Sequence, residues 1–136
     1  MTISKLMVRP VVTVHPEDKL EEVRDIFNQS GFHHVLVVER GYLVGVVSDR
    51  DLLKALSPKV GTPLEGRADR LTLDKRVHQV MSSRLRVLTE QHRVVDAVQL
   101  ILDYGVSCVP VVDADDRPVG ILTWRDILRE LLRVRK

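Results

Sequence analysis

The sequence predicts an α+β fold in which two βαββα repeats pack sheet to sheet with pseudo-two-fold symmetry. The first observation is a repeated segment: Gly45–Asp51 (GVVSDRD) returns as Gly120–Asp126 (GILTWRD). Both copies read glycine, two aliphatic residues, a hydroxyl residue, any residue, arginine and aspartate. The second observation is that the flanking residues also match, since Gly31 falls on Gly105. A small sheet with two helices cannot close a core alone, so each repeat is expected to bury its sheet against the other.

The repeat sets the expected domain boundaries. The offset between the copies is 74 residues at Gly31 and Gly105 and 75 residues at Gly45 and Gly120, so the second copy has one extra residue near a hairpin tip. We expect a first repeat over residues 1–56 and a second over 75–136, together forming one globular module. Residues 57–74 hold two prolines, two glycines and few large apolar residues, which predicts an exposed linker.

Each repeat is expected to begin with a short strand and a helix. The strands are residues 11–14 and 85–88, whose aliphatic and β-branched content suits a sheet. The first helix follows His15–Asp18, where a proline and acids suit an opening turn. Apolar residues then recur at helical spacing in both copies: Leu20, Val23, Ile26 and Phe27, then Val94, Ala97, Val98 and Ile101. Gly31 and Gly105 are expected to end these helices with a positive φ.

A hairpin and a closing helix are expected to complete each repeat. The hairpins join residues 35–38 to 43–47 and residues 109–112 to 119–122 through turn-forming residues. The closing helices begin at the repeated motif, where the hydroxyl and the aspartate have the spacing of a capping box. The same arrangement suits a nucleotide, whose phosphates accept from backbone N–H groups while a carboxylate accepts from ribose hydroxyls. Both interpretations remain open at this point.

Composition excludes several classes of protein. The 136 residues are 44% hydrophobic, and 21 Lys and Arg against 19 Asp and Glu give a net charge of +2. This balance favours neither nucleic acid nor a membrane surface. No apolar run reaches the roughly 20 residues of a membrane helix, and the N-terminus lacks a signal-peptide core, so a cytoplasmic protein is expected. The single cysteine, Cys108, excludes an internal disulfide and a cysteine-rich zinc site.

The tandem repeat, the order of elements and the repeated motif resemble a pair of CBS domains, the regulatory module named after cystathionine β-synthase. The resemblance extends from Ile3 to Leu132 and is also carried by the segments Ile3–Met7, Val14–Leu20 and Val109–Asp113. It implies a sensor of adenosine-containing ligands, such as AMP, ADP, ATP or S-adenosylmethionine, and no catalytic activity. The nucleotide would act as a regulatory ligand.

The resemblance also implies two composite clefts, in which the motif of one repeat faces strand residues of the other. One set is Ser48, Arg50, Asp51, Arg84, Leu85, Val106, Ser107 and Cys108. The other set is Thr123, Arg125, Asp126, Ser4, Arg9, Phe32, His33 and His34. The aspartates would hold ribose hydroxyls, the hydroxyls and arginines would take phosphate, and the strand residues would clamp adenine. Leu36 departs from the pattern, because proline is common at this position and Pro110 occupies it in the second repeat.

Other functions have less support from the sequence. His33 and His34 are adjacent on an expected strand and point to opposite faces, so no metal site is expected. No Ser/His/Asp or Cys/His arrangement indicates catalysis. The basic C-terminal helix lacks interleaved aromatic residues, which favours a solvated face over nucleic-acid binding.

The expected function is a ligand-sensing module that passes nucleotide occupancy to an unknown regulated protein. The alternative is a structural dimerisation module whose clefts are degenerate. A homodimer is expected in either case, because the closing helices carry more leucines than one small core needs. These leucines are Leu52, Leu56, Leu128, Leu131 and Leu132.

Overall fold

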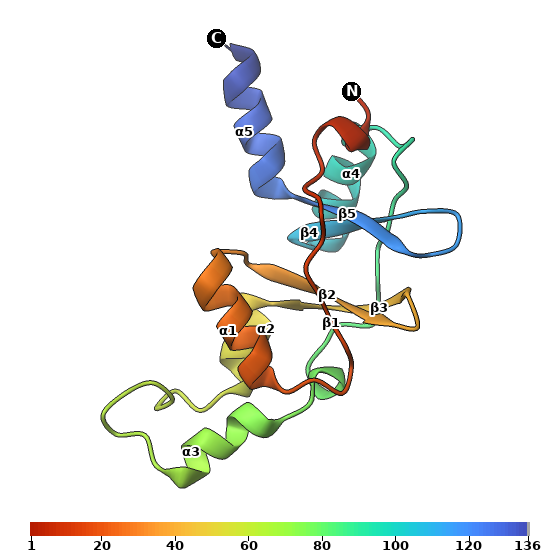
Figure 1. Cartoon of the computed structure of the whole chain (residues 1–136). Coiled ribbons are helices and arrows are strands. Elements are labelled where there is room, and N and C mark those ends of the chain that lie inside the picture. Colours follow the sequence, from red (N-terminus) through yellow and green to blue (C-terminus); the bar gives the residue numbers. More distant parts are fainter. Residues whose placement is uncertain (136) are drawn as a thin grey trace. The chain divides into compact units, whose positions relative to one another are not determined.

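The computed structural model describes residues 1–135 and shows the order helix, strand, strand, helix twice (Figure 1). The first repeat consists of β1 (Thr13–Val14), α1 (Leu20–Ser30), β2 (His34–Glu39), β3 (Tyr42–Ser48) and α2 (Asp49–Ala55). The second consists of α4 (Val94–Tyr104), β4 (Cys108–Val112), β5 (Pro118–Thr123) and α5 (Trp124–Arg135). Helix α3 (Arg67–Leu71) lies between them in sequence, and 3-10 turns cover Ile3–Lys5, Thr72–Asp74 and Val77–Gln79. The predicted α+β class is confirmed.

The opening strand forms in the first repeat but shrinks to a single bridge in the second. In the first, β1 pairs with β2 in parallel, and the Leu36 N–H donates to the Val12 carbonyl at 3.1 Å. Pro110 stands at the matched position of the second repeat and has no N–H to donate. Pairing there is limited to an isolated bridge between Leu88 and Val111. The strand expected at residues 85–88 is therefore only one residue pair in the structure.

The hairpins and the ends of the first helices follow the sequence prediction. Strand β2 neighbours β3, and β4 pairs with β5 in an antiparallel ladder with an irregularity between Val111 and Val112. Helices α1 and α4 end at Gly31 and Gly105, whose φ values are 73° and 65°. Both glycines occupy the left-handed region, which a residue with a Cβ adopts only at a cost.

Two compact units make up the chain, and each takes its opening segment from the other repeat. We call the first the Asp51 unit; it consists of Val12–Arg40 and Val44–Arg84. The Asp126 unit consists of Met1–Val11, Gly41–Leu43 and the chain from Leu85 onward. The opening segments are tied in by backbone hydrogen bonds: Val8 exchanges two with Ile121, at 2.8 and 3.1 Å, and Ser82 exchanges two with Val46, at 2.9 and 3.1 Å.

Each unit has its own hydrophobic core. The core of the Asp51 unit consists of Val14, Leu20, Val23, Val35, Val37, Val47, Leu52 and Val77. That of the Asp126 unit consists of Ile3, Met7, Ala97, Val109, Val111 and Leu122. Leu52 is only 6% exposed, whereas its neighbour Leu53 is 74% exposed. The expectation that Leu52 belongs to a dimer face was therefore wrong, because the helix turns this side chain into the core.

A methionine of each opening segment packs against the glycine that begins the motif. A Cβ on Gly120 would lie 2.5 Å from Sδ of Met7, and a Cβ on Gly45 would lie 2.6 Å from Sδ of Met81. Both distances are shorter than carbon and sulfur tolerate in contact. The glycines are thus required by the close approach of the methionines, and this contact holds each opening segment on its unit.

Residues 57–74 are largely exposed, as expected, but they are folded against the Asp51 unit. The Ser57 hydroxyl donates to Asp69 at 2.6 Å, and the Ser57 N–H donates to the Thr72 hydroxyl at 3.1 Å. Leu73 is 6% exposed. These contacts fix α3 near the end of α2, so the segment is an ordered excursion and not an open tether.

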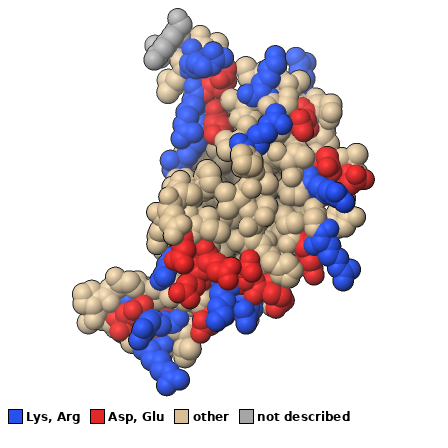
Figure 2. Space-filling view, viewed as in Figure 1, with Lys and Arg blue, Asp and Glu red and all other residues tan. Residues whose placement is uncertain are grey.

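Charged side chains are distributed unevenly over the two units. Figure 2 shows acidic side chains gathered over α1 and basic side chains along α5. Helix α1 exposes Glu21, Glu22 and Asp25, whereas α5 exposes Arg125, Arg129 and Arg133. The net charge of the chain is small, but the surface of α1 is acidic and that of α5 is basic.

We predict that Gly120→Ala destabilises the protein by about 1–3 kcal/mol, because Met7 must move out of the space that the new methyl group occupies. Urea denaturation measures the change in the free energy of unfolding. Gly66→Ala is the matched control, since a Cβ there would meet its nearest atom, in Asp69, at an ordinary 3.6 Å. Equal stability of the two variants would show that Met7 does not depend on Gly120.

Candidate ligand-binding site

The first copy of the motif lies where β3 ends and α2 begins. The Ser48 N–H donates to Oδ2 of Asp51 at 2.9 Å, and the Asp51 N–H donates to the Ser48 hydroxyl at 3.1 Å. This is a complete capping box, as the sequence predicted. Both Ser48 and Asp51 are half-buried. Among residues 1–135, no group donates a hydrogen bond to Oδ1 of Asp51, so capping occupies one oxygen of this carboxylate.

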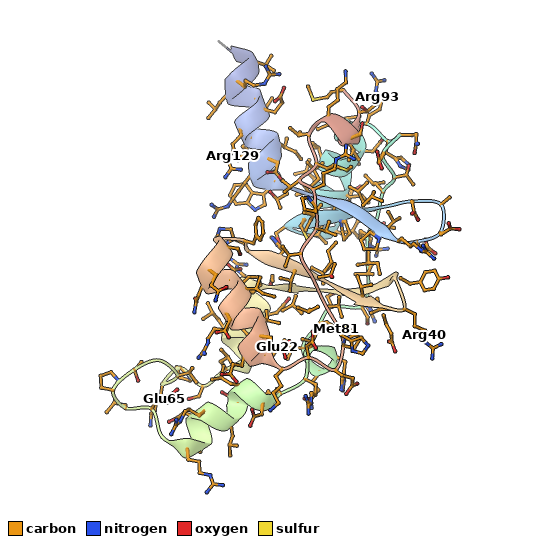
Figure 3. The ribbon with its side chains drawn as sticks, in the orientation of Figure 1. Glu22, Arg40, Glu65, Met81, Arg93 and Arg129 are labelled. Carbon is orange, nitrogen blue, oxygen red and sulfur yellow. The ribbon has the colours of Figure 1, made fainter. Side chains whose placement is uncertain are left out.

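The second copy repeats this arrangement where β5 meets α5. The Thr123 N–H and hydroxyl both donate to Oδ2 of Asp126 at 2.9 Å, and the Asp126 N–H returns a bond to the Thr123 hydroxyl at 3.3 Å. Within residues 1–135, Oδ1 of Asp126 accepts only a long contact from Arg129, at 3.5 Å. Arg129 is labelled on α5 in Figure 3. The motif aspartate is again tied down through one carboxylate oxygen.

An ion pair that the sequence did not predict adjoins the first motif. Nδ1 of His33 lies 2.9 Å from Oδ2 of Asp49, and the Asp49 N–H donates to the His33 carbonyl at 2.9 Å. Burial alone would raise the pKa of Asp49, but the hydrogen bonds from His33 and from the backbone of Arg50, with the charges of His33 and His34, bring this pKa below its usual value. Asp49 is therefore an anion at neutral pH.

The matched position in the second motif holds an aromatic residue. The Trp124 N–H donates to the Ser107 carbonyl at 3.4 Å, which is the same backbone contact that Asp49 makes with His33. The Arg125 guanidinium lies 5.3 Å from the centre of the Trp124 ring. The second motif thus carries an indole and a cation where the first carries a carboxylate and an imidazole.

Two strand residues contact the motif of their own repeat. We expected His33 beside the motif of the second repeat, and the structure shows it in contact with Asp49 in the first. Ser107 was expected beside the first motif, and it contacts Trp124 in the second. The hairpin explains both contacts, because the start of its first strand lies opposite the end of its second strand. The grouping of these residues with the motif of the other repeat stays a prediction.

Sorted by unit, the candidate residues form two sets. The Asp51 unit contains Phe32, His33, His34, Ser48, Arg50, Asp51 and Arg84. The Asp126 unit contains Ser4, Arg9, Leu85, Val106, Ser107, Cys108, Thr123, Arg125 and Asp126. The opening segments contribute to both sets, since Arg84 follows the bridge at Ser82 and Arg9 follows the bridge at Val8. Their contact with a ligand remains a prediction.

A hollow of about 430 Å³ adjoins the first motif within the Asp51 unit. It is lined by Asp51, Lys54, Ala55, Lys75, Gln79 and Val80. Nζ of Lys75 donates to the Ala55 carbonyl at 2.7 Å, which fixes the position of one of the two lysines that line the hollow. The volume falls within the range of small-molecule sites. The arrangement presents a carboxylate beside two ammonium groups and a carboxamide.

Several of these residues could not be found from spacing in the sequence. Asp49 and Trp124 occupy the variable position of the motif. Because the two residues differ in kind, the repeat gives no signal for a function at this position. The His33–Asp49 pair joins residues 16 positions apart. Lys75 and Gln79 reach the first motif only because their segment packs on the Asp51 unit. The sequence did offer one signal for the His33–Asp49 pair: a histidine just before the expected strand and an aspartate at the variable position of the motif have complementary charge.

Metal sites and membrane-spanning helices are both absent from residues 1–135. No group of three or more His, Cys, Asp or Glu side chains is placed to hold a metal ion there. In the same range, none of the helices has the length and apolar character to cross a membrane.

We predict that Asp49→Asn destabilises the protein at pH 7 by at most about 1 kcal/mol, because the lost ion pair is half-exposed. The pKa of Asp49 is lower in the folded state than the usual 3.8, so the stability it contributes is complete above that pH and is lost as pH falls through the folded value. The difference between wild type and variant should therefore shrink in acid.

Chemical denaturation at pH 7 and pH 3 measures this difference. In a His33→Ala background, Asp49→Asn should have a smaller effect, since the partner of the carboxylate is already absent. A difference between wild type and Asp49→Asn that is the same at both pH values would contradict the assignment.

Comparison with known proteins finds similar chains and similar solved structures. A CBS domain-containing protein of Dictyostelium discoideum is 30% identical over 134 residues, which cover 97% of this chain and 92% of that protein. The CBS domain pair of protein MJ0100, solved in complex with 5′-methylthioadenosine and S-adenosyl-L-methionine, is similar with a TM-score of 0.82 and 26% identity, over 100% of this chain and 98% of that one.

The crystal structure of CBSX2 in complex with AMP is similar with a TM-score of 0.80 and 26% identity, over 99% of this chain and 98% of that one. Other relatives are longer, and the chain spans 43% of the length of one of them. The family model of the CBS domain matches residues 3–58 and 77–133, which are the two repeats. With both repeats matched, and with solved CBS domain pairs sharing its fold, the chain belongs to the CBS domain family.

Proposed function

We propose that this chain is a regulatory module that binds adenosine-containing nucleotides and passes their occupancy to a partner protein. Similar solved CBS pairs hold S-adenosyl-L-methionine with 5′-methylthioadenosine in one case and AMP in another. The observation that supports the proposal for this chain is that the cap uses one oxygen of each motif aspartate, Asp51 and Asp126. In each unit, capping takes Oδ2 of the motif aspartate, and no hydrogen bond shorter than 3.5 Å reaches Oδ1 from residues 1–135.

The proposed roles follow from the chemistry of each group. Oδ1 of Asp51 or Asp126 accepts hydrogen bonds from the ribose hydroxyls. The guanidinium groups of Arg50 and Arg125 are exposed beside the motif and suit phosphate, which arginine binds with two parallel hydrogen bonds. The strand residues of each set provide apolar contact and backbone groups for adenine.

The module itself carries out no reaction in this proposal. CBS domain pairs are regulatory modules, and the motif residues are engaged in capping and ion pairs that suit binding. Adenine nucleotides are abundant in the cytoplasm, where we expect the protein to act. The competing function is a structural module whose motifs serve only as helix caps.

We predict that saturating AMP, at about a hundredfold over its dissociation constant, stabilises the fold by roughly 2.7 kcal/mol for each filled site. Asp51→Ala and Asp126→Ala should each remove the share of one site. Calorimetric titration and melting curves with and without AMP measure both quantities, with GMP as a ligand control.

Asp96→Ala is the matched protein control for this test. Asp96 accepts from the Arg93 N–H at 2.9 Å and thus caps α4 away from either motif. Its loss should lower the stability of the free protein by about 1 kcal/mol and leave the gain from AMP intact. Should both motif variants behave like Asp96→Ala, the motifs are caps and the sensor proposal fails.

We also propose that the protein is a homodimer joined through α5. This helix exposes Leu128, Leu131, Leu132 and Val134, with exposed fractions from 48% to 64%. Contiguous apolar surface of this kind is more often covered than left in water.

Sedimentation at micromolar concentration should therefore show twice the chain mass of 15.5 kDa, and Leu131→Glu with Leu132→Glu should give monomers. Leu64→Glu, at a leucine that is 76% exposed on the 57–74 segment, should leave the dimer unchanged. A wild-type protein that sediments only at 15.5 kDa would rule the dimer out.

A further inference from the structure

The two motifs can be compared residue by residue, because one backbone contact marks the same position in both. Asp49 and Trp124 each follow the hydroxyl residue, begin the closing helix and donate a backbone N–H to the residue before the hairpin strand. The acceptors are the carbonyls of His33 and Ser107, at 2.9 and 3.4 Å. A difference in side chain at this position is therefore a difference in the local chemistry of two otherwise matched sites.

The Asp51 unit has an extra carboxylate at this position. The side chain of Asp49 is 46% exposed, so its charge faces solvent beside Arg50 and Asp51 as well as His33. Ser48–Asp51 thus carry two carboxylates and one guanidinium, and Lys54 adds an ammonium group one helical turn on. His34, whose charge also acts on Asp49, is the other titratable group at the start of β2.

The Asp126 unit has two cations at the matched positions but one carboxylate fewer. Trp124 is 42% exposed, and the guanidinium of Arg125 stays close to its ring. Arg129 adds a second cation one helical turn on, 3.5 Å from Oδ1 of Asp126. One carboxylate stands here beside two guanidinium groups, in keeping with the basic side chains along α5 in Figure 2.

We propose that the two units select adenosine ligands of different charge. The Asp126 unit prefers polyphosphates such as ADP and ATP, whereas the Asp51 unit prefers ligands with at most one phosphate or with a positive charge, such as a sulfonium. Asp49 and Trp124 are the residues that set this difference. The inference rests on the proposed function, because it assumes that each unit binds adenosine.

The physical reason is the charge of the phosphate chain. ATP carries about two more negative charges than AMP near neutral pH, and each is repelled by a carboxylate a few ångströms away, with partial screening by water and salt. The same carboxylate attracts a cationic ligand. Replacing it by an indole removes the repulsion and offers a flat apolar surface for stacking.

The test uses full-length variants with one intact site. Asp126→Ala leaves the Asp51 site, and Asp51→Ala leaves the Asp126 site. ATP, AMP and S-adenosylmethionine are titrated into each by calorimetry at pH 8. Melting curves confirm that each variant is folded. The measured quantity is the ratio of the affinities for ATP and AMP.

Two substitutions at the matched position then exchange the preference. Asp49→Asn in the Asp126→Ala background should raise the ATP to AMP ratio about three- to tenfold, and Trp124→Asp in the Asp51→Ala background should lower it by a similar factor. Trp124→Asn separates the loss of the ring from the gain of charge, and should change the ratio less. Glu39→Gln, which removes an exposed carboxylate at the end of β2, should leave the ratio unchanged.

Each outcome decides the question. Equal ratios at the two single sites, or ratios that ignore Asp49→Asn and Trp124→Asp, overturn charge selection while binding of adenosine ligands stands. Absence of binding by wild-type protein and all variants overturns the proposed function, and the selection with it. Opposite shifts in the two backgrounds support the inference.

Discussion

The contact between methionine and glycine is the interaction on which the rest of the structure depends. Met7 lies over Gly120 and Met81 lies over Gly45, each closer than a side chain at the glycine would allow. Met7 comes from the first repeat and Gly120 from the second, whereas Met81 comes from the second and Gly45 from the first. Each contact therefore attaches the opening segment of one repeat to the hairpin of the other. It also fixes the strand that runs directly into the motif. The geometry of each candidate site therefore depends on an apolar contact outside it.

Capping and the proposed ligand binding use the same motif without excluding each other. A capping box needs one side-chain acceptor for the backbone N–H of the hydroxyl residue, and Oδ2 of Asp51 or Asp126 fills that role. The cap holds the carboxylate in one orientation before any ligand arrives. A preorganised acceptor loses less conformational entropy on binding than a mobile one. Local stability of the helix start and readiness of the site thus have a common cause.

The sequence predicted what depends on near neighbours. The repeat, the helix ends at Gly31 and Gly105 and the hairpins follow from residues a few positions apart, and they are present in the structure. What it missed depends on distant contacts: the His33–Asp49 pair and the packing of residues 57–74 on the Asp51 unit. Pro110 is one residue whose local chemistry has a distant effect. It has no N–H to donate, and this weakens the pairing of a strand 22 residues earlier in the chain.

Internal symmetry makes the differences between the repeats informative. A duplicated chain starts with two equal sites, and the backbone contacts of the motif have stayed equal. The side chains at Asp49 and Trp124 differ in charge, size and polarity although their backbone positions match. Neither is needed for the cap, which uses the hydroxyl and the aspartate on either side. Asp49 pairs with His33, yet the side chains of Asp49 and Trp124 are both partly exposed beside the motif, so their difference in charge bears directly on any ligand that meets the motif there.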